Sequence, residues 1–339
     1  MSLVIVGSGM AGVTVAEERL KKDPLAAVTL ITQETDGYYS RPMLSHGFSR
    51  DDVESKIILK SFEALHQGGL KVMTGCEVTA IDRSQKTVRY LEKGLEGAIG
   101  YDRLVLAPGS DAFIPPPLKP FEDLLYRLNS LQDLKALRTL RTPIKDRGQQ
   151  PHWAIIGGGL IGSEVASDLA RSGDAVTLFH ALPRLMERQL IEADSDTLKA
   201  VLEALGVTVQ LEVAVTGLER QGERFGVQLE NDLSFGFDAI IAATGFKPRT
   251  QLAEAAGLQV NRGILVNPWL KTEDDAIYAL GDAAECADGK IYAYVMPIRH
   301  QALWLATHLH GPADAPWEPP SFSPRAKVHG FTAAHAYRT

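Results

Sequence analysis

Cysteine is nearly absent from this chain of 339 residues, which contains only Cys76 and Cys286, far apart and in no C-x-x-C pattern. Two separate cysteines exclude a disulfide-stapled scaffold, a four-cysteine zinc site and an iron–sulfur cluster bound by four cysteines. Such low cysteine usage is typical of proteins in a reducing compartment, so we expect a cytoplasmic location.

Long apolar runs and basic clusters are missing as well. No stretch of about 20 apolar residues occurs, which argues against a transmembrane helix and a membrane partner. No basic segment precedes the first apolar run, so we expect no signal peptide. The net charge is −7 and there is no long Lys/Arg run, which makes general nucleic-acid binding a poor candidate.

One pattern occurs twice, in residues 2–20 and 153–170: a short apolar run, then G-x-G-x-x-G, then a helical pattern. The first glycine of such a motif permits a tight turn, the second lets the backbone approach a pyrophosphate, and the third allows close helix–strand packing. Because both copies have the strand–turn–helix context, they predict two dinucleotide-binding sites. The glycines are Gly7, Gly9, Gly12, Gly157, Gly159 and Gly162.

Each copy continues into a second apolar strand, at residues 27–32 and 175–180. A carboxylate that binds the ribose is expected about 20 residues after the motif, and Glu34 fits this position in the first copy. The second copy has His180 there instead of an acid. A neutral imidazole can bond a ribose hydroxyl and a protonated one could tolerate a 2′-phosphate, so both NADH and NADPH stay open.

Other segments predict the framework around these copies. Residues 70–82 and 86–91 alternate like antiparallel strands, and residues 101–109 read as a buried strand that ends in a turn. Residues 113–120 form a proline-rich linker, and a helix is expected to begin near Pro297. Residues 311–339 show no periodicity.

Several motifs together resemble a known family. The turn Ala243–Gly245 and the stretch Tyr278–Asp282, added to the two glycine motifs, resemble the FAD- and NAD-linked flavoprotein reductases with two dinucleotide-binding domains. Residues 38–49, 157–164, 242–258 and 277–285 are more closely similar to the rubredoxin and flavorubredoxin reductases. The resemblance covers residues 2 to about 311, which is most of the chain.

The resemblance implies an α/β fold with two Rossmann-like domains of the glutathione-reductase type. It assigns residues 1–116 and 243–311 to a split FAD-binding domain and residues 117–242 to an NAD-binding domain. Residues 312–339 would then be a tail or the remnant of a truncated or missing C-terminal domain.

The resemblance also implies an FAD site. The first three glycines would cradle the FAD pyrophosphate, and Glu34 would bond the adenosine ribose. Arg41 would lie beside the phosphates and the flavin, the Val78 backbone would face the adenine, and Asp282 would bond the ribityl chain. Arg41 could instead be a surface arginine, and Asp282 a helix N-cap.

The start of the helix near Pro297 would lie at the pyrimidine edge of the flavin, where Val295 and Met296 would make contact. The alternative is an ordinary surface helix with proline in its first turn. The remaining positions expected to contact FAD or NAD are Met10, Ala11, Pro42, Ala107, Gly109, Leu160, Ile161, Gly245 and Gly281.

On the nicotinamide side, Glu164 matches a family glutamate near the carboxamide. Its alternative role is to complement the helix dipole. His46 occupies a position where some relatives carry lysine, and we predict that His46 and Glu164 form a polar catalytic pair; the alternative for His46 is a structural histidine.

The expected activity is an FAD-dependent transfer of electrons from NADH, or NADPH, to a small iron–sulfur or rubredoxin-type carrier. Disulfide reductases and NADH oxidases of this fold need cysteine near the flavin, and residues 38–47 contain none. A ferredoxin reductase of an oxygenase or nitrite reductase system, and a flavoprotein redox sensor with little turnover, are the alternatives. We expect a monomer or homodimer, with carrier contacts among Arg299, His300, His308, Arg325 and Lys327.

Overall fold

The computed structural model describes residues 2–230, 233–309 and 315–338, and the chain packs as two compact units. Unit 1 is formed by Met1–Ser40, Ile58–Asp111 and Lys247–Phe322, and unit 2 by Arg41–Ile57, Ala112–Phe246 and Ser323–Thr339. These two units are defined by which parts of the chain pack together, and not by which cofactor they would bind. The predicted division by cofactor stays a prediction, and residues 310–314, where its FAD domain meets its tail, lie outside the described residues.

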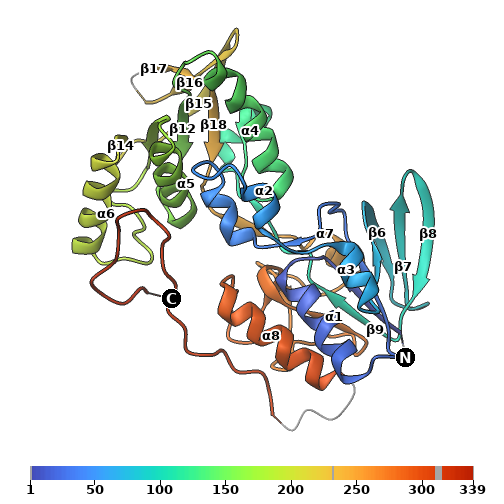
Figure 1. The fold of residues 1–339 in the computed structure, drawn as a ribbon. Helices are drawn as coiled ribbons and strands as arrows, with labels where there is room; N and C mark the ends of the chain where they lie inside the picture. The colour runs from blue at the N-terminus through green and yellow to red at the C-terminus, as the bar shows by residue number, and fades with distance from the viewer. Residues whose placement is uncertain (1, 231–232, 310–314, 339) are drawn as a thin grey trace. The chain divides into compact units, whose positions relative to one another are not determined.

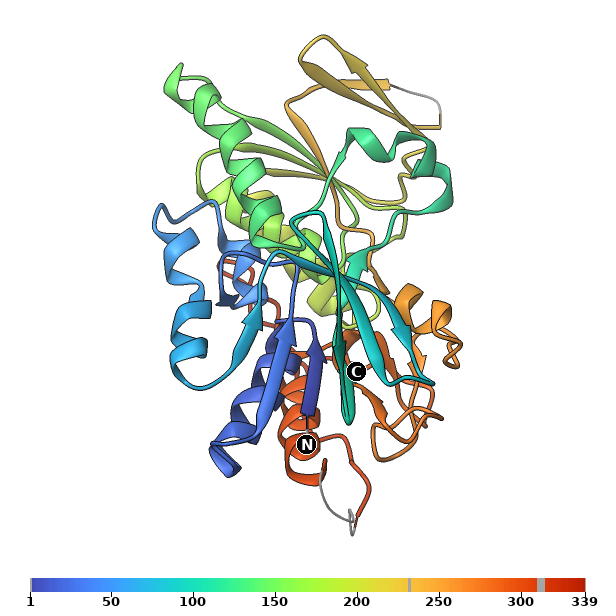
Figure 2. The ribbon, with the colours of Figure 1, turned by 90° about the vertical axis from the view of Figure 1, so that its right-hand side faces the viewer.

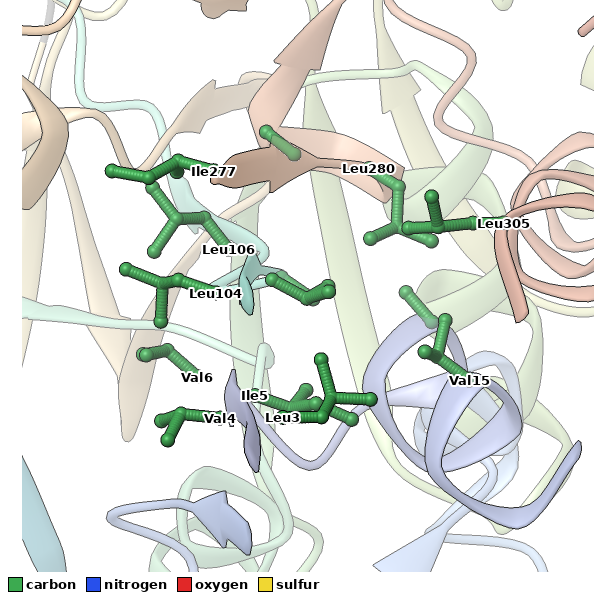
Figure 3. Close-up of a cluster of buried hydrophobic side chains, with 14 of the residues drawn as sticks. Leu3, Val4, Ile5, Val6, Val15, Leu104, Leu106, Ile277, Leu280 and Leu305 are labelled. Atoms are coloured by element: carbon green, nitrogen blue, oxygen red, sulfur yellow. The ribbon is translucent and has the colours of Figure 1, made fainter. Parts of the chain in front are cut away.

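Unit 1 is built on a five-stranded sheet in the order β21-β9-β1-β2-β5, and each neighbouring pair is parallel. Its strands are rich in Val, Ile and Leu that are buried on both faces, as parallel strands covered on both sides require. Figure 3 shows this core, to which β1, β9 and the end of β21 contribute side by side. The strands are β1 (Ser2–Val6), β2 (Ala27–Ile31), β5 (Lys71–Met73), β9 (Arg103–Leu106) and β21 (Ile277–Ala279).

Two long helices, α1 (Met10–Lys22) and α8 (Val295–His308), lie side by side in unit 1 (Figures 1 and 2). Val15 of α1 and Leu305 of α8 are fully buried in the same core cluster (Figure 3). Helix α8 begins slightly before the expected Pro297, so Val295 and Met296 belong to its first turn. The shorter helices of unit 1 are α3 (Phe62–Gln67), α7 (Gln251–Ala255) and the 3₁₀ turn η3 (Gly281–Ala283).

The segment 70–82, expected as one strand, forms two. Residues Lys71–Met73 extend the parallel sheet as β5, and Cys76–Asp82 form β6 of a separate antiparallel sheet with β7 (Thr87–Glu92) and β8 (Leu95–Gly100). Gly75, with φ +59°, turns the chain between them. The antiparallel pairing of the second half with residues 86–91 is confirmed. Short strands complete unit 1: β3 (Tyr38–Tyr39), β4 (Ile58–Lys60), β20 (Ile264–Leu265) and β22 (Ala284–Glu285).

Unit 2 repeats the parallel arrangement in a sheet of order β11-β18-β12-β13-β14. Its largest fully buried side chains include Trp153, Phe179 and Phe237. The strands are β11 (Leu125–Tyr126), β12 (His152–Ile156), β13 (Ala175–Phe179), β14 (Val207–Gln210) and β18 (Ala239–Ala242). Its helical elements are η1 (Arg41–His46), α2 (Val53–Lys56), η2 (Pro116–Leu124), α4 (Leu131–Asp146), α5 (Leu160–Arg171) and α6 (Glu192–Ala204).

Three antiparallel strands, β15 (Gly217–Gln221), β16 (Arg224–Gln228) and β17 (Leu233–Phe237), also belong to unit 2. Strands β10 (Ser110–Ala112) and β19 (Phe246–Pro248) fall where the chain passes from one unit to the other. The two parallel sheets with flanking helices confirm the predicted α/β fold with two Rossmann-like sheets.

The C-terminal segment contains no helix or strand within residues 315–338. Residues 323–338 belong to unit 2, where they lie along α5 and α6 (Figure 1). Val328 and Phe331 of this segment are buried. No described helix combines the length and the apolar content that crossing a bilayer requires.

Candidate dinucleotide sites and a buried polar cluster

The first glycine of each motif sits in a turn that other residues cannot adopt without strain. Gly7 has φ +107° and Gly157 has φ +111°. A Cβ at Gly7 would lie 2.1 Å from the carbonyl oxygen of Ala107, and one at Gly157 would lie 2.4 Å from that of Ala243. Both turns therefore press against the end of the neighbouring strand, and only glycine fits.

The third glycine of each motif is fixed by helix packing. A Cβ at Gly12 would lie 2.0 Å from the Gly7 carbonyl oxygen, and a Cβ at Gly162 would lie 1.9 Å from the Gly157 oxygen. The protein's own backbone thus requires glycine at these positions in both units.

The middle glycine of each motif is different, because no atom in the described part of the chain requires it. A Cβ at Gly9 or at Gly159 would meet nothing within 4 Å, although each residue is the N-cap of its helix. Neither makes a side-chain capping bond, and neither helix has an acidic residue in its first turn. Open space before uncapped amides at the positive end of a helix fits a phosphate ligand. The residues present therefore fit a dinucleotide pyrophosphate in each unit.

Glu34 is held beside the first motif in unit 1. Its backbone N–H donates to Thr32 Oγ1 at 3.1 Å, and Thr32 Oγ1 lies 2.8 Å from Ser8 Oγ inside the glycine loop. Tyr39 donates its hydroxyl to Glu34 Oε1 at 2.8 Å. The carboxylate is half-buried at the carboxyl end of β2, which is where a ribose carboxylate is expected.

Asp282 lies inside the turn η3 of unit 1, so it is not the helix N-cap that we considered as an alternative. It is half-buried, and Ser110 donates its hydroxyl to Asp282 Oδ2 at 2.9 Å. The preceding Gly281, with φ +74°, donates its N–H to the Gln301 side chain at 2.8 Å. These bonds fix the carboxylate of Asp282 after β21.

The first turn of α8 carries two exposed apolar side chains, Val295 at 41% and Met296 at 58% exposure. Its N-cap, Tyr294, makes no side-chain capping bond. An uncapped helix start with exposed apolar residues fits an aromatic, negatively charged ligand edge.

The other positions predicted to contact FAD or NAD are divided between the units. Val78 lies in β6 opposite Tyr90 in unit 1. Arg41 and Pro42 begin η1 in unit 2, where Arg41 donates to the carbonyl oxygen of Asn129 at 2.5 Å. Met10 and Ala11 start α1, Leu160 and the exposed Ile161 start α5, and Gly109 and Gly245 have positive φ.

His180 has an internal role in unit 2. Gly158 of the second motif donates its N–H to His180 Nδ1 at 3.0 Å, so Nδ1 must be unprotonated. The imidazole is therefore the neutral tautomer with its proton on Nε2, which lies 3.1 Å from the Arg184 carbonyl oxygen and 3.2 Å from Glu187 Oε2. Because the bonded ring is neutral, the structure does not support a protonated His180 that receives a 2′-phosphate.

Glu164 is buried, with 1% of its side chain exposed, and it has three donors. Ser45 donates its hydroxyl to Oε2 at 2.6 Å, and Lys327 donates its backbone N–H to Oε1 at 2.8 Å and its ammonium to Oε2 at 2.6 Å. Lys327, which we expected among exposed carrier contacts, is thus the counter-ion of Glu164.

His46, the last residue of η1, lies against Asp168, which follows Glu164 by one helical turn on α5. Its Nδ1 is 4.0 Å from Asp168 Oδ1, its ring packs edge-on against His329 at 5.1 Å, and its Nε2 has no hydrogen-bond partner within the described part of the chain. Burial lowers the pKa of His46, and the Asp168 charge only partly offsets this effect. The predicted His46–Glu164 pair is therefore not formed among the described residues, because Ser45 and Lys327 occupy the carboxylate.

Asp168 is fully buried and accepts bonds from two segments. Phe48 and Ser49 donate their backbone N–H groups to Oδ2 at 2.8 and 3.1 Å, and His329 Nε2 lies 3.2 Å from Oδ1. Arg171 donates to His329 Nδ1 at 2.7 Å, which places the His329 proton on Nε2, facing Asp168. The sequence reasoning missed Asp168. The signal was its spacing from Glu164, which puts both carboxylates on one face of α5.

Both cysteines are unsuited to thiol chemistry. Cys76 and Cys286 are buried and unpaired in unit 1. Burial raises the pKa of Cys76, and burial together with the charge of Asp288 raises the pKa of Cys286 to about 12. Because the thiolate is the nucleophile, neither residue is poised for disulfide exchange.

Comparison with known proteins places these features in a family. Residues 1–305 match the family described as pyridine nucleotide-disulphide oxidoreductase. A protein of Citrobacter koseri named nitric oxide reductase FlRd-NAD(+) reductase is 35% identical over 96% of this chain and 83% of its own length.

Solved structures agree. An NAD-dependent persulfide reductase from A. fulgidus superposes with a TM-score of 0.87 at 25% identity, over 97% of this chain and 62% of that one, so this chain spans less than two thirds of its length. A covalent putidaredoxin reductase–putidaredoxin complex gives a TM-score of 0.84 at 27% identity, over 97% of this chain and 79% of that one. With its two glycine motifs on two parallel sheets, this chain belongs to the pyridine nucleotide-disulphide oxidoreductase family.

Proposed function

We propose that this chain is an FAD-dependent oxidoreductase that takes electrons from NADH and passes them singly to a small carrier protein, a rubredoxin or flavorubredoxin. The observation that carries the proposal is the open space at Gly9 in unit 1 and at Gly159 in unit 2. Each of these glycines precedes a helix whose first amides have no side-chain cap. No contact among the described residues requires glycine there, whereas the close approach of a pyrophosphate does.

Unit 1 is the FAD unit in this proposal. The amides at the start of α1 bind the pyrophosphate, and Glu34 accepts hydrogen bonds from the adenosine ribose. Asp282, fixed by Ser110, accepts from the ribityl chain. The uncapped start of α8 supports negative charge on the flavin, with Val295 and Met296 as its apolar contacts.

Unit 2 is the NADH unit. The amides at the start of α5 bind the pyrophosphate, and the exposed Ile161 offers apolar surface beside them. Glu164 keeps a fixed, charge-balanced carboxylate in the second turn of that helix. Once bound, FAD supplies the conversion of a hydride into single electrons, so no side-chain nucleophile is needed.

The chemistry of the thiols and the names of the relatives both bear on the identity of the electron carrier. Both thiols are buried with raised pKa values, which disfavours disulfide or persulfide reduction. The Citrobacter koseri relative is named for flavorubredoxin, which supports a rubredoxin-type carrier. The likeness to the putidaredoxin reductase complex supports a ferredoxin-type carrier as the second candidate. The two unpaired cysteines support work in the reducing cytoplasm.

The test is a carrier panel. The purified chain is loaded with FAD and supplied with NADH, and its rates with rubredoxin, ferredoxin, a disulfide, a persulfide and oxygen are compared. The proposal expects rapid reduction of rubredoxin and slow consumption of oxygen. Reduction of ferredoxin alone would favour the second candidate, and turnover of a disulfide or persulfide instead of any carrier would refute the proposal.

A further inference from the structure

The two dinucleotide motifs can be aligned through a hydrogen bond that occurs in both units. Gly7 donates its N–H to the carbonyl oxygen of Ile31 at 2.9 Å, and Gly157 donates to that of Phe179 at 2.8 Å. Counting on from these matched residues, His180 corresponds to Thr32 and Leu182 corresponds to Glu34. In unit 2, Leu182 therefore occupies the position of the ribose carboxylate, and this apolar residue is 43% exposed.

The loop that follows β13 folds back onto the glycine motif. Met186 donates its N–H to the Gly158 carbonyl oxygen at 2.9 Å, and Leu185 packs so closely that a Cβ at Gly158 would lie 2.4 Å from it. Glu187 comes next in the chain. This loop therefore brings an acidic residue, seven positions after His180, back to the motif.

The carboxylate of Glu187 is oriented by the neutral His180. Gly158 fixes one ring nitrogen, and the protonated Nε2 at the other side of the ring lies 3.2 Å from Glu187 Oε2. The Glu187 side chain is 22% exposed, so it is not closed off from solvent.

The nearby cations are less suited to bind a 2′-phosphate. Arg184 donates to the Leu190 carbonyl oxygen at 3.1 Å and is half-buried. Arg188 lies 3.7 Å from Glu187 Oε1 and is 86% exposed, so its charge is solvated.

From this geometry we propose that Glu187, positioned by His180, is the carboxylate that accepts the adenosine ribose hydroxyls and makes this chain prefer NADH to NADPH. A carboxylate accepts from both hydroxyls of an unmodified ribose, and it repels the dianionic 2′-phosphate. The inference rests on the proposed function and names the specificity of its NADH site.

The test measures binding without turnover. Calorimetric titrations of the FAD-loaded chain compare ADP-ribose with 2′-phospho-ADP-ribose, for the wild-type protein and for Glu187→Gln. The wild-type protein should bind ADP-ribose more tightly. Glu187→Gln keeps an oxygen that accepts from His180 Nε2 but loses the charge, so the preference should fall at least about tenfold.

Two variants sharpen the result. Glu187→Asp keeps the charge and should retain discrimination against the 2′-phosphate. Glu212→Gln is the matched control, since Glu212 is exposed and its backbone N–H donates to the Leu182 carbonyl oxygen at 3.2 Å, with no contact to His180 among the described residues.

The outcomes separate the two proposals. An unchanged preference in Glu187→Gln, or an equal loss in Glu212→Gln, would overturn the inference and leave the proposed function intact. Failure of the wild-type protein to bind either nucleotide would overturn the NADH site itself, and the inference with it. A wild-type preference for the 2′-phosphorylated ligand would assign the dominant role to Arg188.

Discussion

Glu164 is a buried carboxylate whose charge is balanced inside unit 2 by Lys327. Replacing Lys327 with Met should leave that charge with the Ser45 hydroxyl and a backbone amide as its donors among the described residues. Breaking a fully buried pair costs about 3–5 kcal/mol, and because Lys327 is 35% exposed we expect a smaller loss of about 1–3 kcal/mol.

Urea unfolding of the Lys327→Met variant measures this loss. The double variant Lys327→Met with Glu164→Gln is the control, because it removes the unpaired charge and should recover much of the stability. Equal stability of the wild-type and Lys327→Met proteins would show that the pair contributes nothing to folding.

His46 should make stability depend on pH. Burial lowers the pKa of His46 in the folded chain, so the folded state binds fewer protons than the unfolded state, whose histidine titrates near 6.5. Its contribution is therefore present above about pH 6.5 and is lost as the pH falls through the folded-state pKa. A His46→Asn variant should lose less stability than the wild-type protein between pH 7 and pH 5, measured by thermal unfolding. A steeper loss in the variant would contradict this sign.

The glycine turn before α1 allows binding and folding to be separated. Gly9→Ala meets no protein atom, so the variant should fold normally and bind FAD more weakly, because the added methyl enters the expected pyrophosphate space. Gly12→Ala puts its Cβ 2.0 Å from a backbone oxygen and should lose at least about 1–3 kcal/mol of stability. FAD fluorescence titration and circular dichroism distinguish the two effects. Unchanged FAD affinity in Gly9→Ala would contradict the assignment.

The start of α6 anchors the C-terminal segment. Asp194 accepts from the backbone N–H groups of Ala334 at 3.0 Å and His335 at 3.1 Å. Burial raises the pKa of Asp194, but these bonds and the His335 side chain outweigh that effect, so its pKa lies below the ordinary value. The anchor is therefore stable at neutral pH and weakens as the pH falls through the folded-state pKa.

Removing this anchor should loosen the segment. In Asp194→Ala, trypsin should cleave after the exposed Arg325 several-fold faster than in the wild-type chain, because the segment opens more often. Asp196→Ala, on the exposed side of the same helix, is the matched control. Cleavage at the wild-type rate in Asp194→Ala would indicate that other contacts hold the segment.

Local patterns were enough to predict the strand–turn–helix elements, because glycine spacing and apolar runs act over a few residues. Contacts made by irregular segments were not predictable in this way. Nothing in the local sequence indicates that Lys327 reaches Glu164 or that Glu187 returns to His180, since both depend on how irregular segments fold back. The apolar pattern of residues 70–82 continues on both sides of Gly75 and so predicts one strand, whereas the positive φ of Gly75 turns the chain and divides the segment into two.

The whole molecule consists of two similar units, each with its own dinucleotide motif. This duplication suits a protein that transfers electrons between two dinucleotide cofactors. The duplication was visible in the sequence, whereas the assignment of residues 41–57 and 323–338 to unit 2 depends on long-range packing. The roles predicted for Glu34, Asp282 and the start of α8 remain predictions. The contacts of the two carboxylates and the uncapped start of the helix are compatible with them.

The stoichiometry of carrier reduction tests the central claim most directly. The FAD-loaded chain, without oxygen, is mixed with one equivalent of NADH and an excess of oxidised rubredoxin, and reduced rubredoxin is counted by absorbance. A flavin that takes a hydride and releases single electrons predicts two reduced rubredoxins per NADH. Rapid reduction of the flavin by NADH with no reduced rubredoxin would contradict the account.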